Sequence, residues 1–292
     1  MFPQVQTLFA PHEILKETVA TRLSLKKGIP VTYKAGDQLN NALSLNVLQP
    51  GEVAATAGTS GVIYGVSNQL EYDQQSRINS FAHVNYKADE ARIGILLCIN
   101  GAGIFNRWVK NLIGANRSYA TLNEAAAKVS PGSNGLLALP FGNGAERMLN
   151  NRQVGAHFQN LDFNIHTDAH LVRAAQEGVA FAFRYGLDIM RENGMHPSII
   201  RAGRANLFLS DVFIQSFVNA TQTAIEFYEG DGSYGAALGA GIGAGIYANT
   251  TEAFSNRKSV DCIEPEEDNN CEAQYRQWKI FLNEKLNIEQ TH

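Results

Sequence analysis

Strand-like and helix-like segments alternate along most of this chain, and one tight hairpin interrupts the alternation. Short runs of aliphatic and β-branched residues, typical of buried strands, occur at 92–99, 136–139, 198–201 and 223–228. The stretches between them predict helices, the longest from Thr167-Asp168, a plausible N-cap, to about Glu192. A further helix is predicted near the N-terminus, over about 11–25. We therefore expect a mixed α/β fold in which helices cover a sheet.

The hairpin is predicted at residues 51–66, GEVAATAGTSGVIYGV, with the tip Gly58-Thr59-Ser60-Gly61. Glycines permit a positive φ and the close approach of a ligand. Successive N–H groups in such a turn can hold an anion, and the hydroxyls of Thr59 and Ser60 can donate to phosphate oxygens. An ordinary hairpin turn explains the tetrapeptide more simply, and the lysine of a Walker P-loop is absent.

Two strand-to-helix connections are further candidates for function. Asp37 follows a predicted strand at 31–33, where it can cap the next helix or present a carboxylate at the carboxyl end of the sheet. Such a carboxylate can accept a proton from an alcohol that attacks a phosphoryl group. The segment 202–206, AGRAN, joins a strand to a helix start that could attract phosphate, or is only a tight connection.

Composition limits the classes of protein to consider. The chain has 292 residues, 45% hydrophobic and 18% charged, so a sizeable core is expected. A net charge of −4 argues against a general nucleic-acid binder, and three cysteines make no disulfide framework. The apolar run 235–247, GAALGAGIGAGIY, is shorter than the roughly 20 residues of a membrane span and predicts a helix with a small-residue face. With no signal-peptide pattern, we expect a cytoplasmic protein.

A metal site built from protein side chains is not expected. His157, His166 and His170 lie close in sequence, but no cysteine joins them and His166 precedes the predicted helix cap. We interpret them as surface histidines. Spacing also assembles no Ser/His/Asp constellation.

Taken in order, these segments resemble the FGGY carbohydrate kinases, and within that family the xylulokinases most. The similarity runs from about Leu23 to Ala248. The segments that carry it are Gly-Ile-Pro-Val before Gly36-Asp37, the Gly58–Gly61 tip, a glycine-rich loop before Trp108, Leu139-Pro140 with Gly144-Ala145-Glu146-Arg147, Ala202-Gly203, and Gly235–Ala240. Each is weak alone, but their shared order is specific.

The resemblance implies an actin-like α/β fold of ribonuclease-H-like topology, with a mixed sheet flanked by helices. Residues 1–292 would then form the C-terminal kinase domain, in which 249–292 is a polar segment followed by a helix. The family's N-terminal domain, which holds most of the sugar pocket, would precede it. A chain without that domain is expected to be inactive towards sugar.

The implied reaction is transfer of the γ-phosphoryl group of ATP, with Mg²⁺, to a sugar hydroxyl, most simply from D-xylulose to D-xylulose 5-phosphate. The alternatives are gluconate, rhamnulose, fuculose, ribulose or glycerol as substrate, or a non-catalytic actin-fold nucleotide-binding module. Retention of Asp37 argues against the last. The implied partners are the sugar and ATP, with no nucleic acid or membrane, and a homodimer is a further option.

Particular residues acquire roles through this resemblance. Asp37 matches the catalytic base, and Gly58, Thr59, Ser60 and Gly61 match the phosphate-binding hairpin. Gly103, ahead of Trp108, matches a glycine near the nucleotide, while Gly203 and Asn206 match the turn and helix start that approach ATP.

The sequence also departs from the family pattern. The usual triple glycine before the nucleotide helix is Arg201-Ala202-Gly203 here, and Arg204 is bulky where a small residue is common. Glu146 and Arg147 match a family motif to which we assign no ligand contact.

Overall fold

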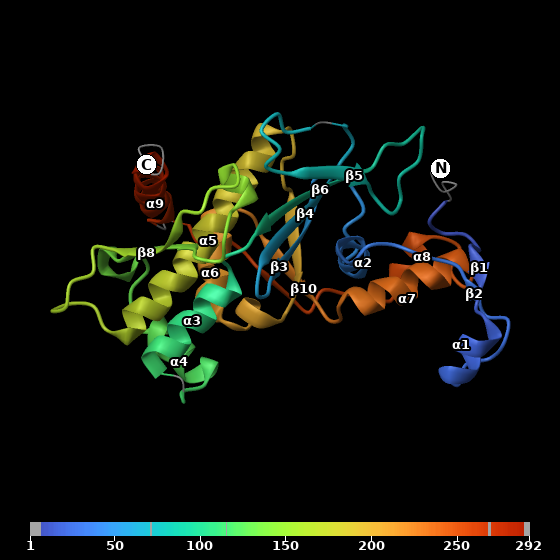
Figure 1. The fold of residues 1–292 in the computed structure, drawn as a ribbon, viewed down its shortest axis with the longest axis horizontal. Helices are drawn as coiled ribbons and strands as arrows, with labels where there is room; N and C mark the ends of the chain where they lie inside the picture. The colour runs from blue at the N-terminus through green and yellow to red at the C-terminus, as the bar shows by residue number, and fades with distance from the viewer. Residues whose placement is uncertain (1–6, 71, 115, 268–269, 289–292) are drawn as a thin grey trace.

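A mixed sheet forms the centre of the computed structural model, which describes residues 7–70, 72–114, 116–267 and 270–288 (Figure 1). Its seven strands follow the order β11-β10-β9-β3-β4-β6-β5. Their bounds are β3 (Glu52–Ala57), β4 (Gly61–Ser67), β5 (Asn79–Ala82), β6 (Ile93–Ile99), β9 (Ile199–Gly203), β10 (Ile225–Tyr228) and β11 (Asp261–Ile263). Strands β3, β4 and β6 form an antiparallel meander, and β9 and β10 run parallel to β3 on its other side. This is the ribonuclease-H-like arrangement expected from the sequence.

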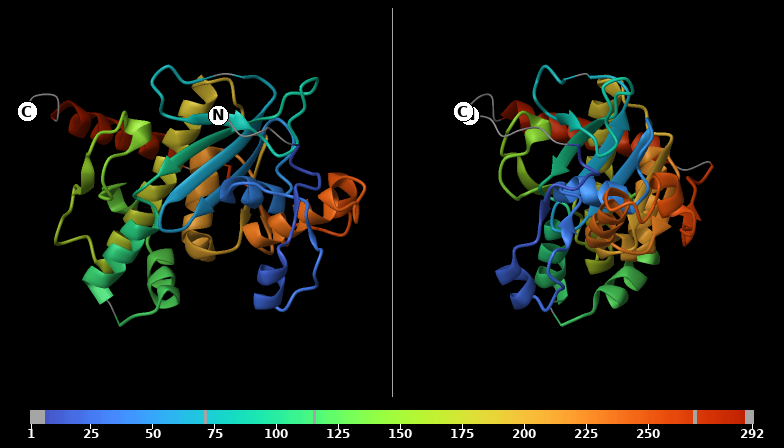
Figure 2. Two further views of the ribbon diagram at one scale, coloured as in Figure 1. Left: turned by 45° about the vertical axis from the view of Figure 1, so that its right-hand side comes forward. Right: turned by 90° about the vertical axis from the view of Figure 1, so that its right-hand side faces the viewer.

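Helices cover both faces of the sheet. Helices α5 (Asp168–Glu192) and α6 (Asp211–Thr221) pack on one face, while α2 (Asp37–Ser44) and α7 (Gly232–Gly243) pack together on the other. Figure 2 shows α9 (Cys271–Ile288) and α7 on opposite sides of the molecule. Helices α3 (Gly103–Gly114) and α4 (Tyr119–Ala127) contact α5.

The remaining elements are short. Strands β1 (Glu13–Ile14) and β2 (Pro30–Val31) pair with each other, as do β7 (Leu137–Phe141) and β8 (Gly155–Gln159). Helices α1 and α8 span Glu17–Arg22 and Thr250–Phe254, and the 3₁₀ turns η1, η2 and η3 span Ser133–Gly135, Arg147–Leu149 and Asn206–Leu209.

Alternation along the strands divides the sheet into two chemically different faces. Val53 and Ile63 join the large apolar core under α5 and α6, whereas Ala54 and Tyr64 face α2. Trp278 of α9 is fully buried in the large core, where its indole N–H donates to the carbonyl oxygen of Ala138 at 2.8 Å. Burying a large apolar side chain contributes roughly 1.5–3 kcal/mol, so α9 belongs to the core.

The predicted small-residue helix is confirmed as α7. A Cβ at Gly235 would lie 1.9 Å from the carbonyl oxygen of Asn40, and one at Gly243 would lie 2.0 Å from that of Thr32. Glycine therefore lets α7 approach α2 and the residues after β2. No helix in the described ranges has both the length and the apolar composition needed to cross a bilayer.

The N-terminal segment differs from its sequence prediction, which is a helix over 11–25. Only Glu17–Arg22 is helical. The N–H groups of His12 and Leu15 instead donate to the carbonyl oxygens of Val31 and Ile29, at 2.8 and 2.9 Å. Pairing with a distant segment thus overrides local helix propensity. The sequence also failed to predict β5, β8 and β11, three short strands without a long apolar run.

Candidate functional site

The predicted hairpin is present, with a three-residue tip between paired Ala57 and Gly61. Neither Gly58 nor Gly61 has a positive φ, so the conformational reason proposed for these glycines is wrong. Gly61 is required by packing, because a Cβ there would lie 2.7 Å from the ring of Phe183. Thr59 is exposed at the tip.

The hairpin tip is fastened to the N-terminus of α3. The N–H groups of Gly103 and Ile104 donate to the carbonyl oxygens of Gly58 and Thr59, at 2.9 and 3.0 Å. A Cβ at Gly103 would lie only 2.2 Å from the Gly58 oxygen, so this approach requires glycine. Two N–H groups that a helix leaves unpaired at its start are thereby satisfied by the tip.

A buried carboxylate holds the loop that leads into α3. The N–H groups of Asn100 and Gly101 donate to the two carboxylate oxygens of Glu146, at 3.0 and 3.1 Å. Glu146 has no exposed surface, and this burial raises its pKa to about 7, although the two backbone donors act in the opposite direction. Glu146 is therefore a positioning residue for the glycine-rich loop, a role that sequence reasoning did not identify.

A cavity of about 360 Å³ lies where the hairpin tip, α3, α4 and η3 meet. It is lined by Ala57, Gly58, Thr59, Gly103, Asn106, Arg107, Tyr119, Asn123, Asn206, Leu207, Leu209 and Ser210. Four residues predicted from sequence for the nucleotide site thus meet here, although they lie up to 148 positions apart, from Gly58 to Asn206. The other three predicted for it, Ser60, Gly61 and Gly203, are not among the lining residues.

Asn206 approaches the hairpin tip from η3. Its φ of 56° lies in the left-handed region, which asparagine tolerates better than most residues. Its side-chain amide nitrogen lies 3.8 Å from the position that a Cβ on Gly58 would occupy. Gly203, by contrast, faces the end of β10, where its Cβ would lie 3.4 Å from the carbonyl oxygen of Gly230.

The two arginines that depart from the family pattern do not line the cavity. Arg204 pairs with Asp261 and Asp211, at 2.7 and 3.2 Å. Arg201 pairs with Glu52 and Glu226, both at 2.9 Å, on the face of the sheet covered by α2. Both guanidinium groups are held by carboxylates.

Asp37 lies at the first turn of α2, outside this cavity. Its side chain is exposed, and its Oδ1 accepts the N–H of Gln38 at 2.8 Å. Burial raises the pKa of the Cys98 thiol, and the Glu146 and Asp37 carboxylates raise it further against the effect of Arg147. Cys98 pairs with Val62, one residue beyond the hairpin tip.

The histidines give no sign of a metal centre. His166 and His170 lie on either side of the α5 N-cap Thr167, with ring centroids 5.5 Å apart, and both are half-buried rather than fully exposed. In the described part of the chain, no three His, Cys, Asp or Glu side chains are placed to hold a metal ion.

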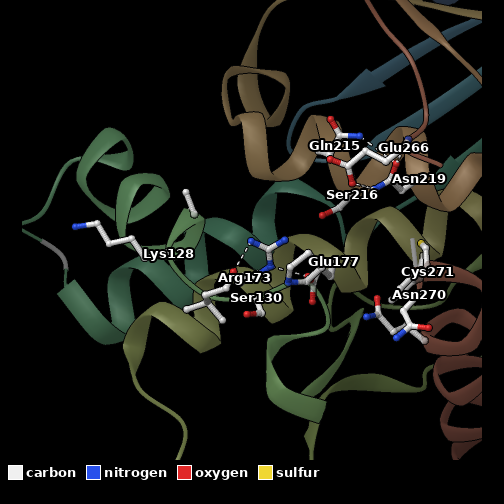
Figure 3. Close-up of a pocket in the computed structure, with 15 residues that line it drawn as sticks. Lys128, Ser130, Arg173, Glu177, Gln215, Ser216, Asn219, Glu266, Asn270 and Cys271 are labelled. Carbon is white, nitrogen blue, oxygen red and sulfur yellow. Dashed lines mark hydrogen bonds and ion pairs between the residues drawn. The ribbon is translucent and has the colours of Figure 1, made fainter. Parts of the chain in front are cut away.

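A larger cavity of about 730 Å³ lies between the segment after α4, α6 and the start of α9 (Figure 3). Its wall contains an ion pair between Arg173 Nε and Glu177 Oε1 at 2.8 Å, and Arg173 also donates to the carbonyl oxygen of Val129 at 2.7 Å. Protein groups satisfy both side chains, so this pair stabilises the local structure. No residue predicted for the site lines this cavity.

Comparison with known proteins assigns the family. The "FGGY family of carbohydrate kinases, C-terminal domain" matches residues 53–247. The chain belongs to the FGGY family of carbohydrate kinases. The matched range contains the hairpin tip, Gly103, Gly203 and Asn206, but it begins after Asp37.

Two curated relatives illustrate the similarity. The chain is 29% identical over 188 residues to the xylulose kinase of Haemophilus influenzae, covering 64% of this chain and 36% of that protein. It is also 29% identical over 173 residues to the gluconokinase of Bacillus subtilis, covering 56% and 33%. This FGGY chain thus spans about a third of the length of each.

A solved structure supports the fold. The xylulose kinase of Rhodospirillum rubrum superimposes with a TM-score of 0.83 at 23% identity, over 96% of this chain and 56% of that one. Together with the sheet order, this confirms the actin-like α/β fold of the FGGY kinases.

Proposed function

We propose that this chain is the nucleotide-binding half of an ATP-dependent carbohydrate kinase, which transfers a phosphoryl group to a sugar hydroxyl. The observation that carries the proposal is the cavity at the hairpin tip, where Gly58, Thr59, Gly103 and Asn206 meet. Membership of the FGGY family supports the reaction class.

The cavity suits a nucleotide in size and chemistry. Its volume of about 360 Å³ falls within the range of small-molecule sites. Tyr119 and Leu209, which are 44% and 65% exposed, offer apolar surface for a base, and Thr59 offers a hydroxyl for phosphate. The described residues that line the cavity include no carboxylate. A carboxylate there would repel a polyanion.

Magnesium would arrive with the nucleotide, where it neutralises charge on the β- and γ-phosphate oxygens. This fits a cavity whose described lining contains no acidic side chain to hold the ion independently. The chain's own groups would bind and orient the phosphates through the tip.

Asp37 is proposed as the base that accepts the proton of the attacking hydroxyl. The exposed position of its side chain at a helix start supports this role.

We propose D-xylulose as the substrate, with gluconate as the second candidate. Equal identities of 29% to a xylulose kinase and to a gluconokinase keep both under consideration. We further propose that residues 1–292 act as one C-terminal domain, and that alone it phosphorylates no sugar. The pairing of β11 with β10 and the burial of Trp278 support including 249–292, although 1–6, 268–269 and 289–292 lie outside the described residues.

The reaction is tested with the whole protein that carries this chain. Coupled ADP-release assays with D-xylulose, gluconate, ribulose, rhamnulose, fuculose and glycerol should give one substrate with a clearly higher kcat/KM. If ATP is consumed with none of them and no sugar phosphate forms, the proposed reaction is wrong.

Nucleotide binding is tested on this chain itself. Titration calorimetry should give Mg-ATP affinity that falls roughly two- to tenfold in Thr59→Ala, because one neutral hydrogen bond to phosphate is lost. Thr251→Ala, an exposed threonine of α8, is the matched control. Equal affinities in all three proteins would remove Thr59 from the site.

A further inference from the structure

Arg107 is the one charged residue among the described residues that line the nucleotide cavity. It shares one face of α3 with Gly103 and Asn106, since residues three and four positions apart lie side by side on a helix. An exposed guanidinium on an otherwise neutral wall gives the cavity a positive potential. Arg107 is therefore the side chain that makes this cavity suitable for an anion.

The N-terminus of α3 cannot supply the same attraction through its first amides. The N–H groups of Gly103 and Ile104 are already donated to the carbonyl oxygens of Gly58 and Thr59. A phosphate in the cavity must therefore find donors elsewhere. In the described lining, the guanidinium of Arg107 is the strongest donor and the only cationic one.

The other cations nearby are engaged with protein groups. Lys110 lies over the ring of Tyr119, with 5.4 Å between Nζ and the ring centroid. Arg204, two residues before the lining residue Asn206, pairs with two carboxylates. Within the described residues, Arg107 makes no hydrogen bond or ion pair with the protein and remains available for a ligand.

The order of residues along α3 indicates which part of a nucleotide Arg107 meets. Gly103 touches the hairpin tip, and Lys110 lies over the ring of Tyr119, which also lines the cavity. Arg107 lies between them, about 6 Å along the helix axis from Gly103 and about 4.5 Å from Lys110, at a rise of roughly 1.5 Å per residue. If the tip takes the transferred phosphoryl group and Tyr119 the base, Arg107 faces the phosphates between them.

We propose that Arg107 binds the α- and β-phosphates of the nucleotide and thereby selects nucleoside di- and triphosphates over nucleosides. This rests on the proposed nucleotide site. The planar guanidinium can donate two parallel hydrogen bonds to one phosphate group, which a lysine cannot reproduce. Because these phosphates keep their charge through the reaction, Arg107 contributes to binding rather than to the chemical step.

The test compares ligands as well as variants. Titrations of the full chain with ATP, ADP and adenosine are made for wild type, Arg107→Gln and Arg204→Gln at fixed salt. Arg107→Gln should weaken ATP and ADP by about ten- to a hundredfold and adenosine by less than about twofold. Arg204→Gln removes the same charge next to η3, outside the cavity, and should leave all three affinities unchanged.

The kinetic readout separates binding from chemistry. In the whole protein, Arg107→Gln should raise the KM for ATP while kcat changes by less than about threefold, and Arg107→Lys should restore only part of the affinity. The thermal midpoint of Arg107→Gln should match that of wild type, because the side chain is exposed.

The outcomes distinguish the two proposals. If wild type binds ATP and Arg107→Gln binds it equally well, or if ATP and adenosine weaken alike, the assignment of Arg107 is overturned while the nucleotide site stands. If wild type binds none of the ligands, both proposals fail.

Discussion

At the hairpin tip, Thr59 borders a cavity that three other parts of the chain also line, whereas Asp37 stands in solvent at the first turn of α2. The tip meets α3, α4 and η3 around a cavity. The carboxylate of Asp37 is exposed, and its described hydrogen bond is to the N–H of the adjacent Gln38. Both side chains are exposed, but of the two only Thr59 lines this cavity.

The difference follows from which elements border each region. The tip lies on the side of the sheet that carries α3 and the turn after β9, so long-range contacts close around it. Asp37 begins a helix that packs against α7 and the opposite face, leaving its first turn uncovered. We infer that the chain contributes nearly all of a phosphate site but only one wall of a sugar site.

The largest expected effect is a loss of catalysis on substitution of the solvent-exposed Asp37. In the whole protein, Asp37→Asn should lower kcat for sugar phosphorylation by about 10²- to 10⁴-fold, the usual contribution of a general base. ATP affinity by calorimetry should stay unchanged, because Asp37 is outside the nucleotide cavity. Asp89→Asn, an exposed carboxylate before β6, is the control. Turnover close to wild type would end the assignment of Asp37 as the base.

The loop that leads into α3 is held by the buried carboxylate of Glu146, whose pKa is raised. Its pKa in the folded chain, about 7, is above the ordinary value of 4.5. Its contribution to stability is therefore complete below pH 4.5 and is lost as pH rises through 7. Relative to Glu146→Gln, the unfolding free energy of wild type should fall by up to about 3 kcal/mol between pH 4.5 and 8. Urea denaturation at several pH values measures this, and a difference independent of pH would contradict it.

Breaking the contact between the tip and α3 should lower both nucleotide affinity and stability. A Cβ in Gly103→Ala would lie 2.2 Å from the Gly58 carbonyl oxygen, so the backbone must shift. We expect ATP affinity to fall by about tenfold and the unfolding free energy to decrease by about 1–3 kcal/mol. Calorimetry and urea denaturation give the two values. Unchanged affinity together with lowered stability would show that the contact shapes the fold and not the site.

The smallest effect is expected from Gly58→Ala, which adds the same methyl group on the other side of this contact. Its Cβ would lie 3.8 Å from the nearest atom, and the residue has no positive φ. Stability should stay within about 0.5 kcal/mol of wild type. A destabilisation as large as that of Gly103→Ala would mean that the tip is packed more tightly than these distances indicate.

Sequence reasoning succeeded where local patterns decide the structure. The β3–β4 hairpin is set by β-branched flanks around a short glycine-bounded tip, and α5 begins at the predicted cap Thr167. It failed at 11–25, where pairing of β1 with β2 replaces part of the expected helix. A local sequence pattern does not indicate which distant segment a strand will pair with.

The candidate site shows the same limit. Sequence reasoning identified the glycine-containing turns as separate candidates. It did not identify the role of the Glu146 carboxylate, which supports the loop from 45 positions away. Arg107 was also missed, although its four-residue step from Gly103 could have indicated a shared helix face. The sequence also did not indicate that the two arginines of the departing motif pair with carboxylates outside the cavity.

The sequence by itself determined the alternation of strands and helices, the hairpin with its tip, and the family, because each depends on residues near one another or on motifs in a fixed order. Only the tertiary structure decided that Gly58, Gly103 and Asn206 meet in one cavity while Asp37 stays open to solvent. The physical reason is that hydrogen bonds and packing between distant segments set the position of each turn, and no local preference contains that information.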